Sequence, residues 1–272
     1  MKKILFLFIF ISNITLSQNI FKTDSMNLLN IVNATYHAQK LTPITYQNIT
    51  QAEIQEKSVG QEPSFIFSNT PSIIAHSDGG HTQGYSYFTL RGMDQTRINI
   101  TLDGVPLNDP SDQAFYFSNY VDILNSISQI QIQRGVGTSK NGKASYVGNI
   151  ALFSPKLTDS HSKEFGFGSG SYNTRRIYGI YNTGIINKKG LYVRISKMYS
   201  DGFKQHASNN SKSLFLSGGW FFDKLIWKIN ILSGNQKNDL AWMAVSENEI
   251  NCDRTINANS EFEKDDFSQN LF

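Results

Sequence analysis

The chain has 272 residues, of which 12% are aromatic and 17% are charged, with 20 glycines. Low charge together with many aromatic residues and glycines excludes intrinsic disorder and is typical of a β-rich protein. The formal net charge is +3, and loss of Lys2 and Lys3 with a cleaved leader would leave +1. Because no basic stripe occurs, nucleic acid is excluded as a partner. Cys252 is the single cysteine and no Cys/His cluster has metal-ligand spacing, so we expect no disulfide, metal or cofactor.

The first 17 residues have the features of a secretory signal peptide. Lys2 and Lys3 precede the apolar run Ile4–Ile11, and small residues surround Leu16. Eight apolar residues are too few to span a bilayer, so we expect cleavage after Ser17 and export of the chain. Residues 18–40 then form a polar extension, either a frayed terminus or a short strand available to a partner.

Two short helices are expected after a first strand at Ile44–Ile49. Thr50 and Glu53 have the spacing of a capping box, which predicts a helix from Gln51. Pro63 early in the next apolar stretch predicts a second helix that ends at Phe67.

The stretch Phe88–Pro110 contains two runs of alternating polarity. In the second run Ile98, Ile100 and Leu102 alternate with polar residues, which is the period of a strand. Asp103 and Gly104 follow as a strong turn signal. Taken alone, the pattern predicts a half-buried hairpin.

The remaining stretch to Pro155 carries further short elements but no catalytic constellation. It predicts a short strand at Ile73-Ile74, a short helix at Val121–Ser128, a strand through Ile130 and Ile132, and a last strand at Asn149–Phe153. The RGVG run lacks the third glycine and the following helix of a dinucleotide loop. His76 and His81 are interpreted as solvated loop residues. No serine sits in a nucleophile elbow, so we expect no catalytic residues and no enzyme.

Several motifs in this stretch occur together and in a recognisable order. They are PSI at Pro71–Ile73, SDGG at Ser77–Gly80, LRGMDQTRINITLDGVPLND at Leu90–Asp109 and IQIQRGVGTSKNG at Ile130–Gly142. This order resembles the plug domain of TonB-dependent outer-membrane receptors, most closely the siderophore-receptor-like proteins of Bacteroidetes. The resemblance implies a small α+β plug over residues 41–157, with a mixed four-stranded sheet and short helices, held inside a large barrel.

The resemblance also implies partners and site residues. The expected partners are TonB with its inner-membrane energising complex, outer-membrane lipid, and a nutrient ligand such as a ferric siderophore, haem or cobalamin. The segment in the place of the TonB-binding box is Ile31, Val32, Asn33, Ala34 and Thr35. The plug-motif and gating positions are Arg91, Gly92, Arg97, Asp103, Gly104, Pro106, Arg134, Gly135 and Gly137. The plug loops expected to face ligand contain Asp78, His81, Tyr85, Asp109, Phe115 and Tyr116.

Residues 158–272 have the pattern of the first strands of a transmembrane β-barrel. Five strands are expected, near Phe165–Gly170, Arg176–Ile186, Leu191–Tyr199, Ser213–Phe222 and Leu225–Leu232. Strands of about ten residues, apolar on one face and polar on the other, are typical of such barrels, as are short turns alternating with long loops. In the third strand Leu191, Val193 and Ile195 share one face, whereas Tyr192 and Arg194 share the other.

The length of the chain predicts an incomplete barrel. A sixth strand is expected at Phe267–Phe272, whereas plugged outer-membrane transporters have about 22 strands. The expected architecture is therefore an α+β plug followed by five to six antiparallel strands of a truncated barrel in the outer membrane. Two alternatives stay open at this point: a secreted soluble binding or structural module with a β-sandwich, and the non-functional product of a truncated gene.

Overall fold

A computed structural model describes residues 44–80, 83–136, 145–157, 160–222 and 225–261. The expected leader, the Ile31–Thr35 segment, His81, Gly137 and the sixth strand lie outside these ranges. The described residues belong to one compact unit, Thr35–Phe272. Among them, no helix is both long enough and apolar enough to cross a membrane.

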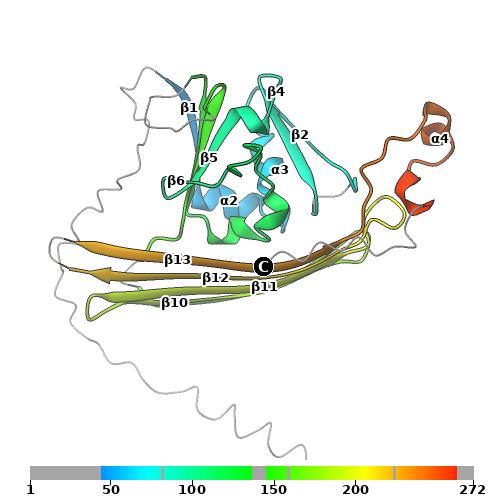
Figure 1. Cartoon of the computed structure of the whole chain (residues 1–272). Coiled ribbons are helices and arrows are strands. Elements are labelled where there is room, and N and C mark those ends of the chain that lie inside the picture. The colour runs from blue at the N-terminus through cyan, green and yellow to red at the C-terminus, as the bar shows by residue number, and fades with distance from the viewer. Residues whose placement is uncertain (1–43, 81–82, 137–144, 158–159, 223–224, 262–272) are drawn as a thin grey trace, which may run out of the picture. The chain divides into compact units, whose positions relative to one another are not determined.

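Residues 44–157, called the plug region below, fold into two small sheets with short helices (Figure 1). The helices are α2 (Gln51–Lys57) and α3 (Pro63–Phe67), and both capping box and Pro start occur as expected. The strands are β1 (Thr45–Thr50), β2 (Ile73–Ser77), β3 (Ser86–Leu90), β4 (Met93–Asp94), β5 (Ile98–Leu102), β6 (Val105–Pro106), β7 (Gln129–Arg134) and β8 (Gly148–Phe153).

The larger sheet of the plug region has the order β1-β7-β8-β5-β6 and is called the mixed sheet. Its β5–β8 pair is parallel, whereas the β1–β7, β7–β8 and β5–β6 pairs are antiparallel. The expected mixed four-stranded sheet corresponds to β1, β7, β8 and β5, with the two-residue β6 added at the edge. Strands β2, β3 and β4 form a separate sheet that the sequence did not predict.

The two runs within Phe88–Pro110 do not pair with each other, because β3 and β5 lie in different sheets. Each run instead forms a tight hairpin with the short strand that follows it, β3 with β4 and β5 with β6. Arg91 and Gly92 both have positive φ and turn the chain back into β4. A 3₁₀ turn at Gln95–Arg97 then leads into β5. β5 is also buried on both faces rather than half-buried. On its polar face, the side-chain amide of Asn99 donates a hydrogen bond to Asn149 Oδ1 at 2.7 Å.

The core of the plug region forms where the helices cover the two sheets. Phe67 of α3 packs edge-to-face against Phe88 at 5.5 Å and Phe117 at 5.4 Å between ring centroids. Ile54 of α2 is buried in the same cluster, with the isoleucines of β5, β7 and β8. The expected helix at Val121–Ser128 is only a 3₁₀ turn at Ile123–Ser126, because Asp122 takes a left-handed conformation with φ 54°.

The second half of the described chain is an antiparallel meander, called the meander sheet. Its strands are β9 (Ser162–Gly170), β10 (Thr174–Ile186), β11 (Lys189–Ser200), β12 (Asn209–Phe221) and β13 (Ile226–Asn238), which lie in sequence order. All five expected strands are present, and most extend further than the sequence pattern predicted. Asn187 and Lys188, both with positive φ, form a two-residue turn, whereas residues 201–208 and the segment that carries α4 (Glu247–Cys252) are long connections at the other end (Figure 1). These ends are called the short-turn end and the long-loop end.

The two faces of the meander sheet have the opposite polarity from a soluble sheet. Along β11 the exposure alternates at every residue. The polar residues Arg194 and Ser196 are buried, whereas Ile195 is 59% exposed. In β13, Trp227, Ile229 and Ile231 are likewise about half exposed. The alternation was expected, and the structure adds that the polar face is the covered one.

Candidate functional site at the contact between the plug region and the meander sheet

A buried ion cluster joins the 3₁₀ turn at Ile123–Ser126 to two strands of the meander sheet. Asp122, which precedes the turn, accepts a hydrogen bond from Arg176 Nη2 of β10 at 2.7 Å. Its second oxygen lies 3.3 Å from Arg194 Nη1 of β11. The side chains of all three residues are at most 7% exposed. A carboxylate and two guanidinium groups are therefore removed from water together.

The hydroxyl groups around Arg194 complete this cluster. Arg194 donates to Ser126 Oγ at 2.7 Å, Ser196 Oγ at 3.0 Å and Ser213 Oγ at 2.9 Å. Tyr192 adds a bond to the carbonyl of Asn125 at 2.9 Å. A buried charge is tolerated when it is paired and its remaining donors are satisfied. The cluster thus fixes the position of the turn on the sheet, and removal of Asp122 would leave two buried guanidinium groups without a counter-charge.

A second polar contact forms at the Asp103-Gly104 turn. Both residues have positive φ, and the pairing of Leu102 with Val105 makes this the two-residue turn that the sequence predicted. The Asp103 carboxylate accepts from the Ser154 amide at 3.0 Å and from Asn230 Nδ2 at 2.9 Å, and lies 3.4 Å from Lys228 Nζ. Burial alone would raise the pKa of Asp103, but Lys228 and the Ser154 hydrogen bonds outweigh it and lower the pKa. The turn is therefore held, ionised, against β13.

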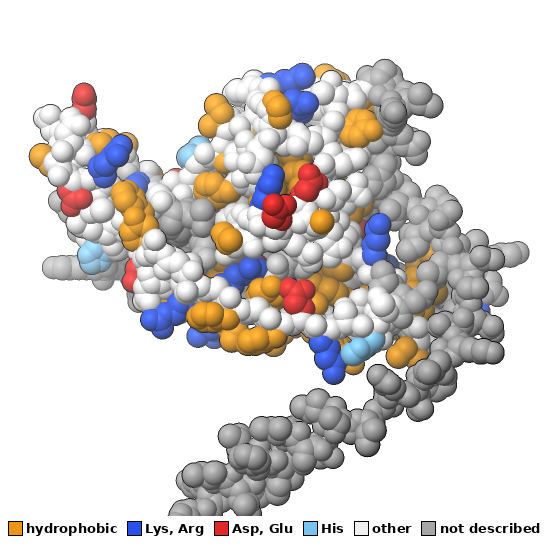
Figure 2. Space-filling view, turned by 180° about the vertical axis from the view of Figure 1, so that it is seen from behind, with side chains coloured by type: hydrophobic (Ala, Val, Ile, Leu, Met, Phe, Trp, Pro, Cys, Tyr) orange, Lys and Arg blue, Asp and Glu red, His pale blue; other side chains and the backbone are white. Residues whose placement is uncertain are grey.

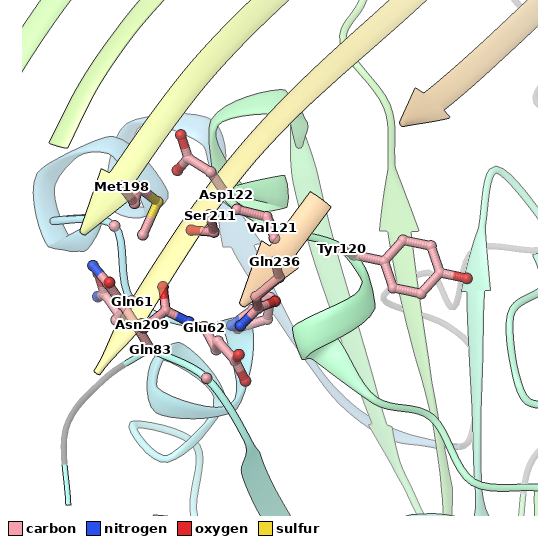
Figure 3. A pocket seen from close by; sticks show the side chains of 13 residues that line it. Gln61, Glu62, Gln83, Tyr120, Val121, Asp122, Met198, Asn209, Ser211 and Gln236 are labelled. Atoms are coloured by element: carbon pink, nitrogen blue, oxygen red, sulfur yellow. The ribbon is translucent and has the colours of Figure 1, made fainter. Parts of the chain in front are cut away.

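A small polar pocket lies between the two contacting surfaces (Figure 3). Figure 3 shows side chains from the plug region and from β11, β12 and β13 around it. Glu62, 9% exposed, lines this pocket and bonds the hydroxyl of Ser86. Burial raises the pKa of Glu62 to about 8, although the Ser86 hydrogen bonds oppose the shift. Glu62 is thus an uncharged carboxylic acid at neutral pH.

Three residues of the plug loops, Asp78, Tyr85 and Tyr116, come together near the long-loop end. Asp78 and Tyr85 line a second pocket with Leu240 and Trp242 of the segment that follows β13. Burial raises the pKa of Tyr85, and nearby Tyr116 and Asp78 raise it further. The expected ligand-facing residues Asp78, Tyr85 and Tyr116 therefore lie within electrostatic range of one another.

The other expected ligand-facing residues behave differently. Phe115 is 2% exposed and packs edge-to-face on Phe117 at 4.6 Å, so the expectation that it faces ligand is wrong. Asp109 is exposed and caps its own turn by accepting from the Ser111 amide at 2.7 Å.

The remaining plug-motif residues shape turns rather than a binding site. The Arg91 amide donates to the Ser72 carbonyl at 2.8 Å, and Arg134 Nη1 donates to the Pro71 carbonyl at 3.3 Å. Arg97 lies 5.7 Å from the ring centre of Tyr146. Gly135 has a φ of 119°, and Pro106 lies in β6. Among the described motif positions, Asp103 is thus the one whose side chain has hydrogen-bond and ion-pair contacts with the meander sheet.

The sequence did not predict Glu62, Asp122, Arg176 or Lys228 as contact residues. Arg176 and Lys228 occupy polar positions of strands, which was the available signal, but a strand pattern does not say what covers its polar face. Within the described ranges, no group of three or more His, Cys, Asp or Glu residues has the arrangement of a metal site.

Comparison with known proteins identifies the plug region. Residues 38–149 match the family model described as TonB-dependent Receptor Plug Domain. The chain therefore carries a plug domain of the TonB-dependent receptor type, followed in the described residues by antiparallel strands that are not closed into a barrel. No curated protein sequence matches the chain significantly.

Solved structures match both parts of the fold. The unliganded ferric citrate transporter FecA superposes with a TM-score of 0.63 at 16% identity, over 79% of this chain and 34% of that chain. The copper transporter OprC gives 0.60 at 15% identity, over 72% of this chain and 32% of that chain. The open form of the ferric-catecholate import receptor Fiu from E. coli K12 gives 0.58 at 16% identity, over 72% and 26%. The chain thus spans about a third or less of the length of these proteins.

Proposed function

We propose that the chain, which carries a TonB-dependent receptor plug domain at residues 38–149, is the N-terminal part of an outer-membrane receptor for a scarce nutrient. In this proposal residues 1–17 are a signal peptide, residues 18–40 an extension, residues 41–157 the plug and residues 158–272 the first part of the barrel wall. The receptor performs no covalent chemistry; it binds ligand outside the cell and opens a path when the plug moves.

One observation carries the proposal, namely the reversed polarity of the meander sheet. Its polar face holds the plug through the Asp122 and Asp103 contacts, whereas Ile195, Trp227 and Ile229 of its apolar face are exposed. An exposed apolar face is favourable where lipid replaces water, and barrel walls alternate in this way between lipid and lumen. A soluble β-sandwich would instead bury its apolar face.

The plug then acts as a gate whose two polar contacts hold it to the wall. TonB captures the Ile31–Thr35 segment by strand addition and transmits force to the plug. Polar contacts suit a surface that must separate, because water can solvate Asp103 and Lys228 once they part. Arg91, Gly92, Arg134 and Gly135 hold the turns that keep the gate compact while it moves.

An iron chelate, such as a ferric siderophore, is the ligand class that we propose. Two of the matched structures are a ferric citrate transporter and a ferric-catecholate import receptor. Asp78, Tyr85 and Tyr116 provide polar and aromatic surface beside the exposed ring of Trp242 at the long-loop end. Haem and cobalamin are the competing ligands in the test below.

Uptake measurements with the complete genomic locus test the proposal. Cells that express the locus with and without TonB are given iron-55 chelates, haem or cobalamin, and uptake of one ligand is expected to depend on TonB and on Ile31–Thr35. Deletion of an equal number of residues within 18–28 is the control. It distinguishes the loss of TonB coupling from the effect of a shorter N-terminal extension. A leaderless chain that stays monomeric and soluble without detergent would contradict the membrane location and favour a soluble module.

A further inference from the structure

Four side chains with metal-binding groups lie on one face of the β2–β3 pair. His76 of β2 is directly opposite Tyr87 of β3. The Asp78 amide donates to the Tyr85 carbonyl at 3.1 Å, which continues the same ladder beyond the end of β2. Directly opposite residues share a face of a sheet, and so do residues two apart along a strand. The four residues therefore form a two-by-two array, called the tyrosine cluster below: His76, Asp78, Tyr85 and Tyr87.

The side chains of the tyrosine cluster contact one another. The rings of His76 and Tyr87 stack with their centroids 5.4 Å apart. The Tyr87 hydroxyl is hydrogen-bonded to the Asp78 carboxylate, and His76 lies within electrostatic range of that carboxylate. Tyr85 lies within electrostatic range of Asp78 and of Tyr116. One imidazole, one carboxylate and two phenols thus lie around the same small volume.

The hydrogen-bonded oxygens of Tyr87 and Asp78 have the separation of two neighbouring metal ligands. Two oxygens in an O–H···O hydrogen bond lie about 2.7 Å apart. Adjacent ligands of an octahedral ion with bonds of about 2.0 Å are separated by roughly 2.8 Å. An ion can therefore replace the proton between these two oxygens while both side chains keep their positions.

The types of ligand in the tyrosine cluster favour ferric iron. Phenolate and carboxylate oxygens are hard, negatively charged ligands, and an imidazole nitrogen also suits iron. Two phenolates and the Asp78 carboxylate carry three negative charges, which neutralise a ferric ion but would leave an excess charge around a divalent ion. Figure 2 shows histidine side chains at separate places on the surface. The imidazole-rich ligand sets typical of zinc and copper are therefore not formed among the described residues.

We propose that the tyrosine cluster coordinates ferric iron directly and selects labile ferric chelates. The inference rests on the proposed function, because it specifies which iron chelates the plug accepts. The four protein ligands leave two positions of an octahedral ion for the chelator. The pocket that Asp78 and Tyr85 line with Trp242 can then receive the rest of the chelate.

Binding exchanges ligands on the iron and leaves it ferric. Bonds form from iron to the two phenol oxygens, the Asp78 carboxylate and the His76 imidazole, and bonds from iron to the chelator break. The two phenol protons pass to the displaced chelator oxygens or to water. A weak hydroxycarboxylate chelator gives up its positions readily, whereas a hexadentate chelator occupies all of them.

Optical titration tests the coordination. The full chain in non-ionic detergent micelles is titrated with ferric citrate, and a phenolate-to-iron charge-transfer band in the visible region is expected. Tyr87→Phe keeps the ring that stacks on His76 but removes the ligand oxygen, so the band should weaken strongly. Iron binding should weaken at least about a hundredfold, because even the loss of a hydrogen-bond partner of a ligand costs about ten- to a hundredfold.

Tyr199→Phe is the matched control for this variant. The Tyr199 hydroxyl also donates to a carboxylate two residues away, Asp201, at 2.6 Å. Its removal should leave both the band and the affinity for iron unchanged. Asp78→Asn is a second variant, which keeps a hydrogen-bond acceptor for Tyr87 and should still weaken iron binding about tenfold or more.

The chelator and the metal are varied in parallel. Ferric nitrilotriacetate should give the same band as ferric citrate, whereas the ferric complex of the hexadentate chelator desferrioxamine should give none. Gallium(III), which has the charge of ferric iron but gives no such band, should compete for the site, and zinc should not. An unchanged band in Tyr87→Phe, an equal loss in Tyr199→Phe, iron bound without a band, or displacement of iron by zinc would each overturn the proposal.

Failure of this site is distinguishable from failure of the proposed function. If the complete locus takes up an iron-55 chelate in a TonB-dependent manner but no band forms, the receptor function stands and direct coordination is wrong. If a band forms that depends on Tyr87 but the locus gives no TonB-dependent uptake, the iron site stands and the proposed function is wrong.

Discussion

The mixed sheet and the meander sheet both alternate apolar and polar residues, but they differ in which residues are exposed. In the mixed sheet, Ile98 and Ile100 of β5 are fully buried, and Asn99 on the other face is buried as well. In the meander sheet, Ile195 is exposed, whereas Arg194 is buried. Alternation therefore specifies that two faces differ but does not specify which face meets solvent. What covers each face decides that, and in this chain the plug covers the polar one.

The contact between the two regions contains two groups of ion pairs. A plug held by a hydrophobic interface would resist displacement in proportion to the apolar area buried. Here the contacts are carried by Asp122, Arg176 and Arg194 in one place and by Asp103 and Lys228 in another. These groups would regain hydration if the two regions separated, as the proposed gating requires.

Removal of the Asp122 carboxylate should have the largest effect on stability. Asp122→Asn keeps a residue that tolerates the left-handed conformation but leaves two buried arginines without their counter-charge. We expect a loss of about 3–5 kcal/mol in the free energy of unfolding, measured by urea titration in lipid vesicles. Asp112→Asn, at an exposed carboxylate, is the control and should be nearly neutral. Equal stability of the two variants would show that the cluster does not hold the regions together.

The stability of the plug region should depend on pH because Glu62 is buried. Its pKa is raised from 4.5 to about 8, so the unfolded chain loses the proton first as pH rises. Stability should therefore fall between pH 4.5 and pH 8 by roughly 3–5 kcal/mol and level off above that range. Glu62→Gln should remove this fall, as seen in urea midpoints at pH 5, 7 and 9. Glu56→Gln, which changes an exposed carboxyl on α2, should leave the dependence of stability on pH unchanged. If both variants give the same dependence, Glu62 is not its source.

The cost of a charge introduced on the apolar face should show whether this face meets lipid or water. Ile195 lies near the middle of β11, and Ile195→Arg should cost about 2–4 kcal/mol if this position meets the bilayer midplane. Val59→Arg, at an exposed apolar residue of the plug region, should change stability by about 0.5 kcal/mol or less. Urea unfolding in vesicles measures both. An effect at Ile195 as small as that at Val59 would remove the argument for a lipid-facing wall.

The smallest effects on stability should come from removing the capping residue of either of two capping boxes of the same type. Thr50 and Ser246 cap α2 and α4 in the same way, each paired with a glutamate three residues later. Thr50→Ala should lower global stability by about 1 kcal/mol, because α2 buries Ile54 in the plug core. Ser246→Ala should loosen only α4, which buries no residue, and leave the global transition unchanged. Hydrogen exchange distinguishes local from global opening, and a global loss at Ser246 would contradict this division.

Much of the local structure was predictable because its determinants are close in sequence. The capping box at Thr50, the Asp103-Gly104 turn and the strands of the meander sheet follow from residues a few positions apart. The plug family could likewise be recognised from motifs in a fixed order. Of the expected ligand-facing residues, Asp78, Tyr85 and Tyr116 lie together, whereas Phe115 does not face outward.

The pairing of distant elements was decided only by the tertiary structure. The motif order could not show that β3 and β5 belong to different sheets, because strand pairing depends on which partners bury their faces best. It also could not place Arg176 and Arg194 on Asp122, which lies 54 residues before Arg176. Alternation along β10–β13 specified two faces from sequence alone. The burial of the polar face required the plug to be folded against it, since a strand's own residues do not encode what will lie on either side.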